Sequence, residues 1–165
     1  MADANAALKT PTDLNRNDTK TVAQALNGIL ADSYALYFKT KNFHWHVSGP
    51  HFRDYHLLLD DQAAQILATT DVIAERVRKT GNATLRSVGD ISRHQTIKDN
   101  DKDFVAPEEM LAELRDDNLK LIALLREAKE IVDEAKDNAT SGILDEWTDQ
   151  AEERAWFLFE TTRKG

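Results

Sequence analysis

The chain is organised around one stretch, His44-Trp45-His46-Val47-Ser48-Gly49-Pro50, and the long run that follows it. We predict that this run forms one helix from Pro50 to Lys79. A proline suits the first helical position, because its missing N–H would have no partner inside the helix, and Gly81 suits a C-terminal cap. This helix carries His56, Asp60, Asp71 and Glu75, whose side chains can bind a metal ion.

These four side chains are spaced for one face of a helix but not for one metal ion. Side chains three or four positions apart share a face, and the step from Asp60 to Asp71 is close to three full turns. Asp60 and Asp71 nevertheless lie roughly 16 Å apart along the axis, at a rise of ~1.5 Å per residue. A metal ion needs its ligand atoms within about 2–2.6 Å. One helix therefore cannot bring both pairs to one ion.

A second, antiparallel copy of the helix removes this difficulty. A twofold axis near Gln65 and Ile66 places the first pair of one copy opposite the second pair of the other. Symmetry then makes two sites, roughly 22 Å apart along the helix. His44, just before the turn, can fold back as a third ligand from the first copy. Four small side chains would let the helices approach closely: Ala63, Ala64, Ala68 and Ala74. The hypothesis is a metal site shared between two subunits.

The residues of this stretch resemble the Dps family of ferritin-like proteins. The resemblance is carried by His44-Trp45, Gly49, Phe52, His56, Asp60, Asp71 and Ala74-Glu75-Arg76. It implies a ferroxidase centre with His44, His56 and Asp60 from one subunit and Asp71 and Glu75 from its twofold mate. It also implies that Trp45 sits beside the iron, where it would intercept oxidising equivalents. Ordinary ferritins instead use Glu-x-x-His motifs inside one bundle, and this sequence contains none.

The resemblance implies a function as well as a site. It implies a hollow dodecamer that oxidises Fe(II), with hydrogen peroxide as the preferred oxidant, and stores ferric iron. Such a protein would suppress hydroxyl-radical production and protect the cell from oxidative stress. The resemblance also places acidic residues, here Asp133 and Asp137, in a threefold pore that admits Fe(II). The ligand set itself is a hard mixture of nitrogen and oxygen that suits Fe(II) and would also take zinc or manganese. The spacing does not choose between peroxide and dioxygen.

Composition limits the remaining classes of protein. The 165 residues suffice for one domain with a real core, and the absence of cysteine excludes disulfides and thiolate metal sites. We find neither an apolar secretory segment nor an apolar run of about 18 residues that could span a bilayer. We therefore expect a soluble cytoplasmic protein, in which association with the nucleoid stays open. The formal net charge of −8 argues against a surface uniformly attractive to nucleic acid.

Apolar periodicity predicts an all-α chain of four long helices. Residues 1–17 are small and polar and are predicted to form a flexible tail, so the domain spans residues 18–165. Besides the helix already described, the predicted helices run from about Asp18 to His44, from Pro107 to about Lys136, and from a turn at Asp137–Ser141 to about Thr162. The connection from Thr80 to about Ala106 is long enough to cross the bundle, and a short helix is predicted within it at Val88–Gln95. Four helices with a long second connection make a ferritin-like bundle.

Several residues also have simpler interpretations. An isolated His-x-x-x-Asp pair on a helix is usually a pair of surface residues without a ligand. Trp45 is most simply an aromatic residue of the core. The acidic residues near Asp137 are most often a solvated helix end. Asp61 points about 100° away from Asp60 and is a poor ligand candidate. The other histidines, His46, His51 and His94, are expected to be exposed or structural.

Two other functions compete with iron oxidation. The first is a DNA-binding protein in which physical protection of DNA is the main role. Dps proteins that condense DNA often use a lysine-rich N-terminal tail, but here three basic residues in the first twenty are matched by three acidic ones. Phosphate contacts dominate non-specific affinity, so we predict weak or absent DNA binding. The second is a monomeric helical interaction module, which predicts neither a shell nor a symmetric interface.

Overall fold

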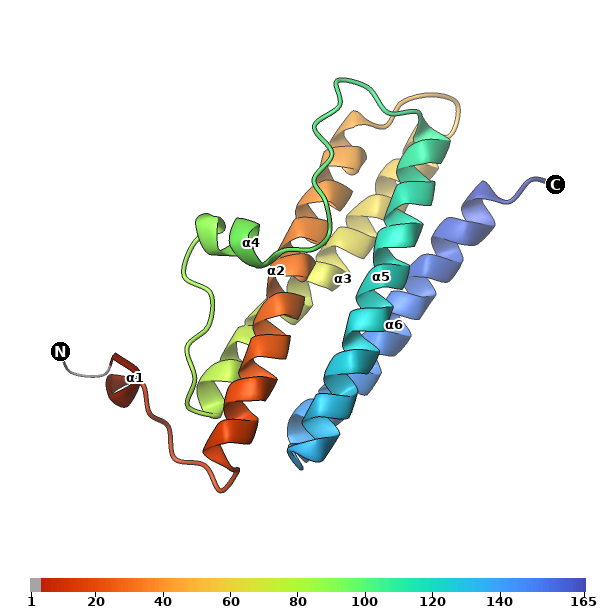
Figure 1. The fold of residues 1–165 in the computed structure, drawn as a ribbon. Coiled ribbons are helices and arrows are strands. Elements are labelled where there is room, and N and C mark those ends of the chain that lie inside the picture. Colours follow the sequence, from red (N-terminus) through yellow and green to blue (C-terminus); the bar gives the residue numbers. More distant parts are fainter. Residues whose placement is uncertain (1–3) are drawn as a thin grey trace.

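The structure is a computed structural model that describes residues 4–165. In this part of the chain all regular structure is helical (Figure 1). The helices are α1 (Ala4–Ala7), α2 (Arg16–His46), α3 (Phe52–Lys79), α4 (Val88–His94), α5 (Pro107–Glu134) and α6 (Asn138–Thr162).

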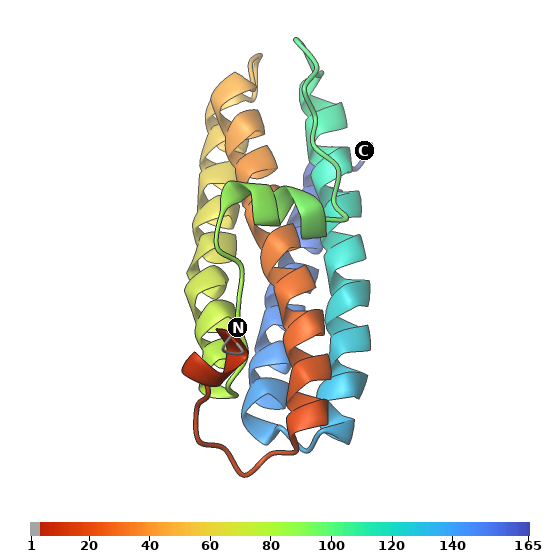
Figure 2. The ribbon, with the colours of Figure 1, turned by 60° about the vertical axis from the view of Figure 1, so that its left-hand side comes forward.

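The four long helices α2, α3, α5 and α6 lie side by side as a bundle (Figures 1 and 2). A tight turn makes α2 and α3 antiparallel, and another does the same for α5 and α6. The connection between α3 and α5 runs the length of the bundle and carries α4 across the outside of α2 (Figure 2). This is the predicted ferritin-like bundle with one long crossover, and the prediction of the fold class is confirmed.

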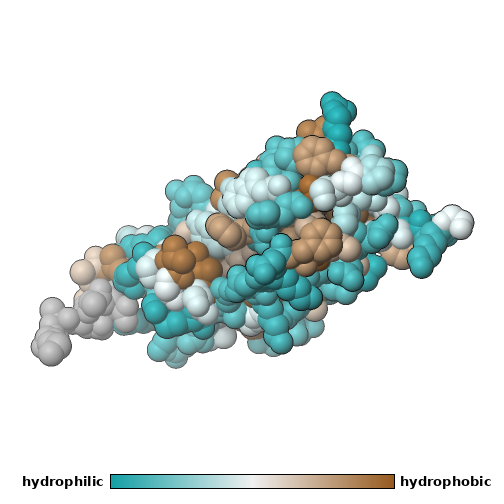
Figure 3. All heavy atoms as spheres, turned by 90° about the horizontal axis from the view of Figure 1, so that it is seen from above, coloured by the Kyte–Doolittle hydropathy of each residue, from teal (hydrophilic) through white to brown (hydrophobic). Residues whose placement is uncertain are grey.

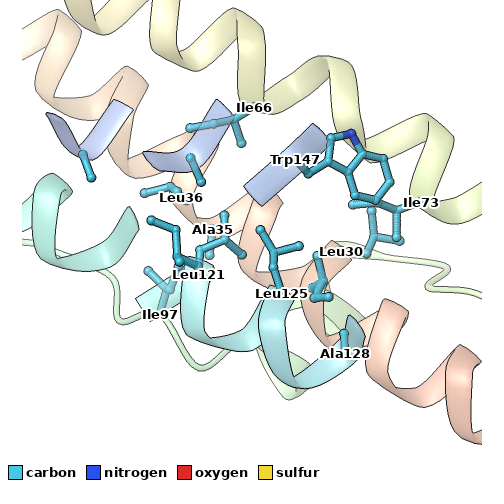
Figure 4. Packing of buried hydrophobic residues seen from close by; sticks show 14 of the residues in the cluster. Leu30, Ala35, Leu36, Ile66, Ile73, Ile97, Leu121, Leu125, Ala128 and Trp147 are labelled. Atoms are coloured by element: carbon cyan, nitrogen blue, oxygen red, sulfur yellow. The ribbon is translucent and has the colours of Figure 1, made fainter. Parts of the chain in front are cut away.

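One apolar cluster runs through the middle of the bundle and draws on all four long helices (Figure 4). Leu36, Ile66 and Leu125 are almost fully buried in it, and Trp147 packs among them from α6. Ile97 joins the same cluster from the crossover. Burial of apolar surface at helical spacing therefore holds the four helices together and fixes which face of each helix remains outside.

A buried carboxylate helps to fasten the crossover to the bundle. Asp32 of α2 accepts hydrogen bonds from the backbone N–H groups of Thr96 and Ile97 at 2.6 and 2.8 Å, and from the Thr96 hydroxyl at 2.7 Å. These donors satisfy a side chain that is almost inaccessible to water. The helix α4, by contrast, buries no residue, and its Val88 is 82 % exposed.

The predicted boundaries need two corrections. Pro50 lies in the turn before α3, which begins at Phe52, so the prediction that Pro50 is the first helical residue is wrong. The predicted turn at Asp137–Ser141 is also wrong, because α6 already starts at Asn138 with Asp137 as its N-cap. The short helix in the crossover and the C-terminal cap at Gly81 are confirmed, since Gly81 has a φ of +87°. Its N–H donates to the Arg78 carbonyl, which closes the end of α3.

The segment before α2 folds along the end of α3 (Figure 1). The guanidinium of Arg78 donates to the Leu8 carbonyl at 3.0 Å, and the Thr10 hydroxyl donates to the Arg78 carbonyl at 2.9 Å. A Cβ on Gly81 would lie 3.3 Å from the Thr10 nitrogen, so this close approach, together with the φ of +87°, favours glycine. That residues 1–17 are a flexible tail stays a prediction, and residues 1–3 lie outside the described part. Within the described part, no helix combines the length and the apolar character needed to cross a membrane.

Candidate metal centre

The turn between α2 and α3 brings two histidines together. His44 lies in the last turn of α2, and His56 lies in the second turn of α3. Gly49, with a φ of +115°, lets the chain reverse within a few residues, and its carbonyl accepts the N–H of Phe52. The two imidazole rings stack with their centroids 3.8 Å apart, and the ring of Phe52 stacks on His56.

Both imidazoles are held in the tautomer that a metal ligand needs. The His44 Nδ1–H donates to the His56 carbonyl at 2.7 Å, and the His56 Nδ1–H donates to the His44 carbonyl at 2.8 Å. A carbonyl oxygen can only accept, so the proton sits on Nδ1 and the lone pair on Nε2 of each neutral ring. Such a backbone contact orients a ligating histidine and fixes its tautomer.

The carboxylate of Asp60 lies beside this pair. Its Oδ1 atom is 3.8 Å from Nε2 of His44, so this carboxylate lies next to the histidine pair, and its role as a metal ligand stays a prediction. The same oxygen accepts a hydrogen bond of 2.8 Å from the Lys41 ammonium. That hydrogen bond and the positive charge of Lys41 lower the pKa of Asp60 below its ordinary value. The carboxylate is therefore ionised at neutral pH.

Asp71 and Glu75 do not join this group within one chain. Both lie exposed on α3, about four to five turns after His56, and Glu75 lies 3.9 Å from Lys79. Among the described residues no three His, Asp or Glu side chains are placed to hold a metal ion. Arg78, one turn after Glu75 on the same helix, donates to the backbone carbonyls of Leu8 and Asn82 and does not pair with these carboxylates. A second copy remains necessary for the predicted site.

Apolar side chains surround these ligands on the outside of the bundle. Trp45 is 54 % exposed and meets the exposed Phe38 edge-on, at 6.0 Å between ring centroids, so its interpretation as a core aromatic is wrong for the single chain. Phe52, Leu57, Leu67 and Val72 of α3 are also exposed. Hydrophobic residues likewise reach the surface in separate patches among hydrophilic ones in Figure 3. An exposed apolar face around incomplete ligands fits a surface that another subunit covers.

The predicted contact stripe on α3 needs one correction. Ala64 and Ala68 are exposed on the same side as Asp60 and Asp71, as a close approach by a second helix requires. Ala63 is buried in the core of its own bundle, so its predicted place at the dyad is wrong. The neighbouring Gln65 is half-buried, and its side-chain oxygen accepts a hydrogen bond from Arg154 of α6.

The two acidic residues predicted for an iron-admitting pore lie in different surroundings. The Asp137 side chain is 3 % exposed and accepts hydrogen bonds from Arg76, from the Thr140 hydroxyl and from the Thr140 N–H. This buried cap of α6 supports neither the pore-lining role of Asp137 nor its interpretation as a solvated helix end. Asp133 is exposed and accepts a hydrogen bond from Ser141, and its place in a pore stays a prediction.

Lys41 is the residue of this site that sequence reasoning missed. Its Nζ atom lies 5.8 Å from the centre of the Trp45 ring as well as against Asp60. The available signal was spacing, since Lys41 comes one helical turn before His44 and so shares its face. The remaining histidines, His46, His51 and His94, are exposed, as predicted.

Comparison with known proteins defines the class first. The ferritin-like domain family matches residues 23–164, and the chain is a ferritin-like protein. A DNA protection during starvation protein of Agrobacterium fabrum is 33 % identical over 150 residues, which are 91 % of this chain and 93 % of the relative. A low temperature-induced protein of Nostoc sp. is 37 % identical over 138 residues, which are 83 % of this chain and 77 % of the relative.

A solved structure extends the likeness along the chain. DpsC from Streptomyces coelicolor superposes with a TM-score of 0.92 at 26 % identity, covering 95 % of this chain and 92 % of that one. With the matched relatives, this likeness shows that the chain belongs to the Dps family.

Proposed function

We propose that this chain oxidises Fe(II) at a site shared by two twofold-related copies and stores the ferric product in a hollow dodecamer. The observation that carries the proposal is the pair His44 and His56. Both rings are fixed by backbone carbonyls so that their Nε2 lone pairs are free beside the Asp60 carboxylate. A structural histidine pair needs no such shared tautomer, whereas a metal site does.

Each group has a defined part in the proposed site. His44, His56 and Asp60 of one copy hold Fe(II), and Asp71 and Glu75 of the second copy complete its coordination. The donors are neutral imidazole nitrogens and carboxylate oxygens, a set that suits Fe(II) and that zinc or manganese would also accept. Few protein ligands per ion leave a position at which an oxidant can approach. Iron is here the substrate and the stored product.

We propose hydrogen peroxide as the oxidant. Two Fe(II) ions each give one electron to the O–O bond of one peroxide molecule, which yields two Fe(III) ions and two hydroxide ions. No hydroxyl radical is released when both electrons reach the same peroxide. Trp45, exposed beside His44, would intercept any single oxidising equivalent that escapes the site. Consumption of Fe(II) and peroxide together in the cytoplasm would protect the cell during oxidative stress.

The test is anaerobic loading with Fe(II) followed by addition of peroxide. The wild-type protein is expected to form ferric species faster than a protein-free control and to retain the iron in a particle much heavier than one chain. The double variant Asp60→Ala, Glu75→Ala should lose the rapid phase, whereas Asp61→Ala, changed at an exposed neighbour, should keep it. Rapid oxidation that survives in the double variant would show that the shared site is not the ferroxidase. If the protein particle has the mass of a single chain, the proposal of a dodecameric cage is wrong.

A further inference from the structure

A small cavity lies among the four long helices of the bundle. Its volume is about 10 Å³, which is close to the space that one water molecule needs. All four helices line it with aliphatic side chains, such as Ile73 and Leu125, and it also has four polar side chains: Ser33, Thr69, Trp147 and Arg154. Figure 4 shows Trp147 beside Ile73 in this part of the core. None of the predicted iron ligands lines the cavity.

The polar side chains around this cavity are chiefly hydrogen-bond donors. The guanidinium of Arg154 and the indole N–H of Trp147 can only donate, and the Ser33 hydroxyl can rotate to donate. The Thr69 hydroxyl already donates to the Ile66 carbonyl at 2.7 Å. Among the described residues, no carboxylate or imidazole side chain lines the cavity. A cation would therefore meet donors and a positive charge, whereas an anion would meet groups that can bind it.

Arg154 brings an uncompensated charge into the interior. The residue is 4 % exposed, its Nε atom donates to Oδ1 of Asn118 at 2.7 Å, and its Nη1 atom donates to Oε1 of Gln65 at 2.8 Å. Both partners are neutral amides. Burial lowers the pKa of the guanidinium to about 10, although the charge of the exposed Glu153 opposes the shift. The group thus stays charged at neutral pH, and a buried charge without a counter-ion is unfavourable.

We propose that the cavity beside Arg154 binds one monatomic anion, chloride under cellular conditions, as the counter-ion of this guanidinium. A water molecule would fill the same space without neutralising the charge. Anions of several heavy atoms, such as sulfate or gluconate, are too large for a cavity of about 10 Å³. The ion would accept hydrogen bonds from Arg154, Trp147 and Ser33. The site lies within one bundle, so it is independent of the proposed iron site.

The first experiment measures thermal stability as chloride replaces gluconate. The sodium and protein concentrations stay fixed, and circular dichroism follows unfolding. A ligand that binds only the folded chain raises Tm by mass action, so we expect a rise of about 3–6 °C once chloride exceeds its dissociation constant about tenfold. Bromide should act in the same way as chloride.

Three variants connect this effect to the cavity. Arg154→Met replaces the guanidinium by an uncharged side chain and should abolish the dependence of Tm on chloride. Arg163→Met, at a guanidinium that is 64 % exposed, is the matched control and should keep it. If Arg154→Met does not fold, Trp147→Phe takes its place, because it removes one N–H donor and should shift the Tm rise to higher chloride concentrations.

The second experiment locates the ion. Crystals grown in sodium bromide should give an anomalous scattering peak in the cavity beside Arg154. Absence of that peak would overturn the proposal and leave the cavity to water. An equal chloride dependence in Arg154→Met would also overturn it, because the anion would then act elsewhere. A bromide peak without any chloride dependence of Tm would mean binding at crystal concentration only, which overturns the role of counter-ion.

Discussion

At the residue scale, the residue that follows the end of α5 has a backbone conformation that a side chain disfavours. Lys136 has a φ of +58°, the one positive value among the non-glycine residues described. The N–H groups of Lys136 and Asp137 donate to the carbonyls of Asp133 and Val132, which closes the helix in a Schellman motif. A residue with a Cβ in this conformation costs roughly 1–2 kcal/mol, whereas glycine adopts it freely.

Lys136→Gly is therefore expected to stabilise the protein. The gain should be about 0.5–1 kcal/mol, because relief of the strain exceeds the added flexibility of the unfolded chain. Urea unfolding, monitored by circular dichroism, measures it. Lys102→Gly, at an exposed loop position, serves as the control and should give no comparable gain. A loss of stability in Lys136→Gly would show that the lysine side chain contributes more than its backbone costs.

The carboxyl group of Asp117 makes the stability of the fold depend on pH. Burial raises the pKa of its carboxyl, although a hydrogen bond of 2.7 Å from the buried Lys39 ammonium opposes the shift. An acid whose folded-state pKa is raised binds its proton more readily in the folded chain. Its contribution to stability is then complete below the unfolded pKa of about 3.9 and is lost as the pH rises through the folded pKa.

Asp117→Asn should remove this dependence. The difference in the free energy of unfolding between the variant and wild type is expected to move in favour of the variant as the pH rises from about 4. Because the variant also loses an ion pair with Lys39, the slope against pH is the quantity to measure, in urea titrations at several pH values. Asp116→Asn, at the exposed neighbouring carboxylate, should leave the slope unchanged. If the free energy of unfolding of Asp117→Asn changes with pH with the same slope as that of wild type, the prediction is contradicted.

At the scale of the elements, a buried carboxylate of α2 anchors the middle of the crossover. The carboxylate of Asp32 accepts three hydrogen bonds from Thr96 and Ile97, and α4 on the same crossover buries nothing of its own. The packing of α4 therefore cannot replace this anchor. The crossover is expected to be the first part of the domain to open, because few buried contacts hold it.

Asp32→Ala should destabilise the domain by about 2–4 kcal/mol, because buried N–H donors would lose a charged acceptor. Hydrogen exchange at Thr96 and Ile97 should accelerate more than exchange in the middle of α3. Asp13→Ala, on an exposed residue, is the control. Unchanged protection of the two amides would mean that the apolar contacts of Ile97 hold the crossover without Asp32.

At the scale of the whole molecule, the proposed site belongs to a pair of chains. One half of the ligands, His56 and Asp60, and the other half, Asp71 and Glu75, lie on one helix that cannot fold back on itself. A chain that lacks one half can therefore be complemented by a chain that lacks the other. In such a mixed pair, one of the two sites is intact and the other has neither half.

Complementation is a direct test of this arrangement. The double variants His56→Ala, Asp60→Ala and Asp71→Ala, Glu75→Ala should each lack rapid iron oxidation. After they are unfolded together and reassembled, about half of the pairs should be mixed, with one intact site in each, so roughly a quarter of the wild-type sites should return. Separately reassembled variants that are mixed afterwards are the control. No recovery in co-assembled cages of the correct mass would exclude a site shared across the dyad.

At the same scale, the net charge of the chain determines how strongly it can bind DNA. At −8 per chain, the proposed cage of many copies would repel a polyanion, and the N-terminal segment carries no excess of basic residues. We expect a gel shift to show weak retention of DNA at ~50 mM salt and none at ~200 mM, because counterion release weakens steeply with salt. Tight retention at the higher salt would restore DNA protection as the main role. A Dps protein with a lysine-rich tail is the positive control.

The sequence alone determined the four long helices and the pairing of possible ligands on α3. Apolar spacing and the caps at Gly81 and Pro107 act within a few residues, so they can be recognised without tertiary contacts. The distance between Asp60 and Asp71 follows from helix geometry, so the need for a second copy of the chain follows from spacing along one helix.

Only the tertiary structure decided how the ligands are held and what lies beside them. The exchange of hydrogen bonds between His44 and His56 depends on the path of the turn, which placed Pro50 outside α3. The burial of Asp137 depends on Arg76, which reaches it from another helix. The contact of Lys41 with Asp60 joins α2 to α3 in the same way. Such contacts join residues distant in sequence, and their geometry is set by packing rather than by spacing along the chain.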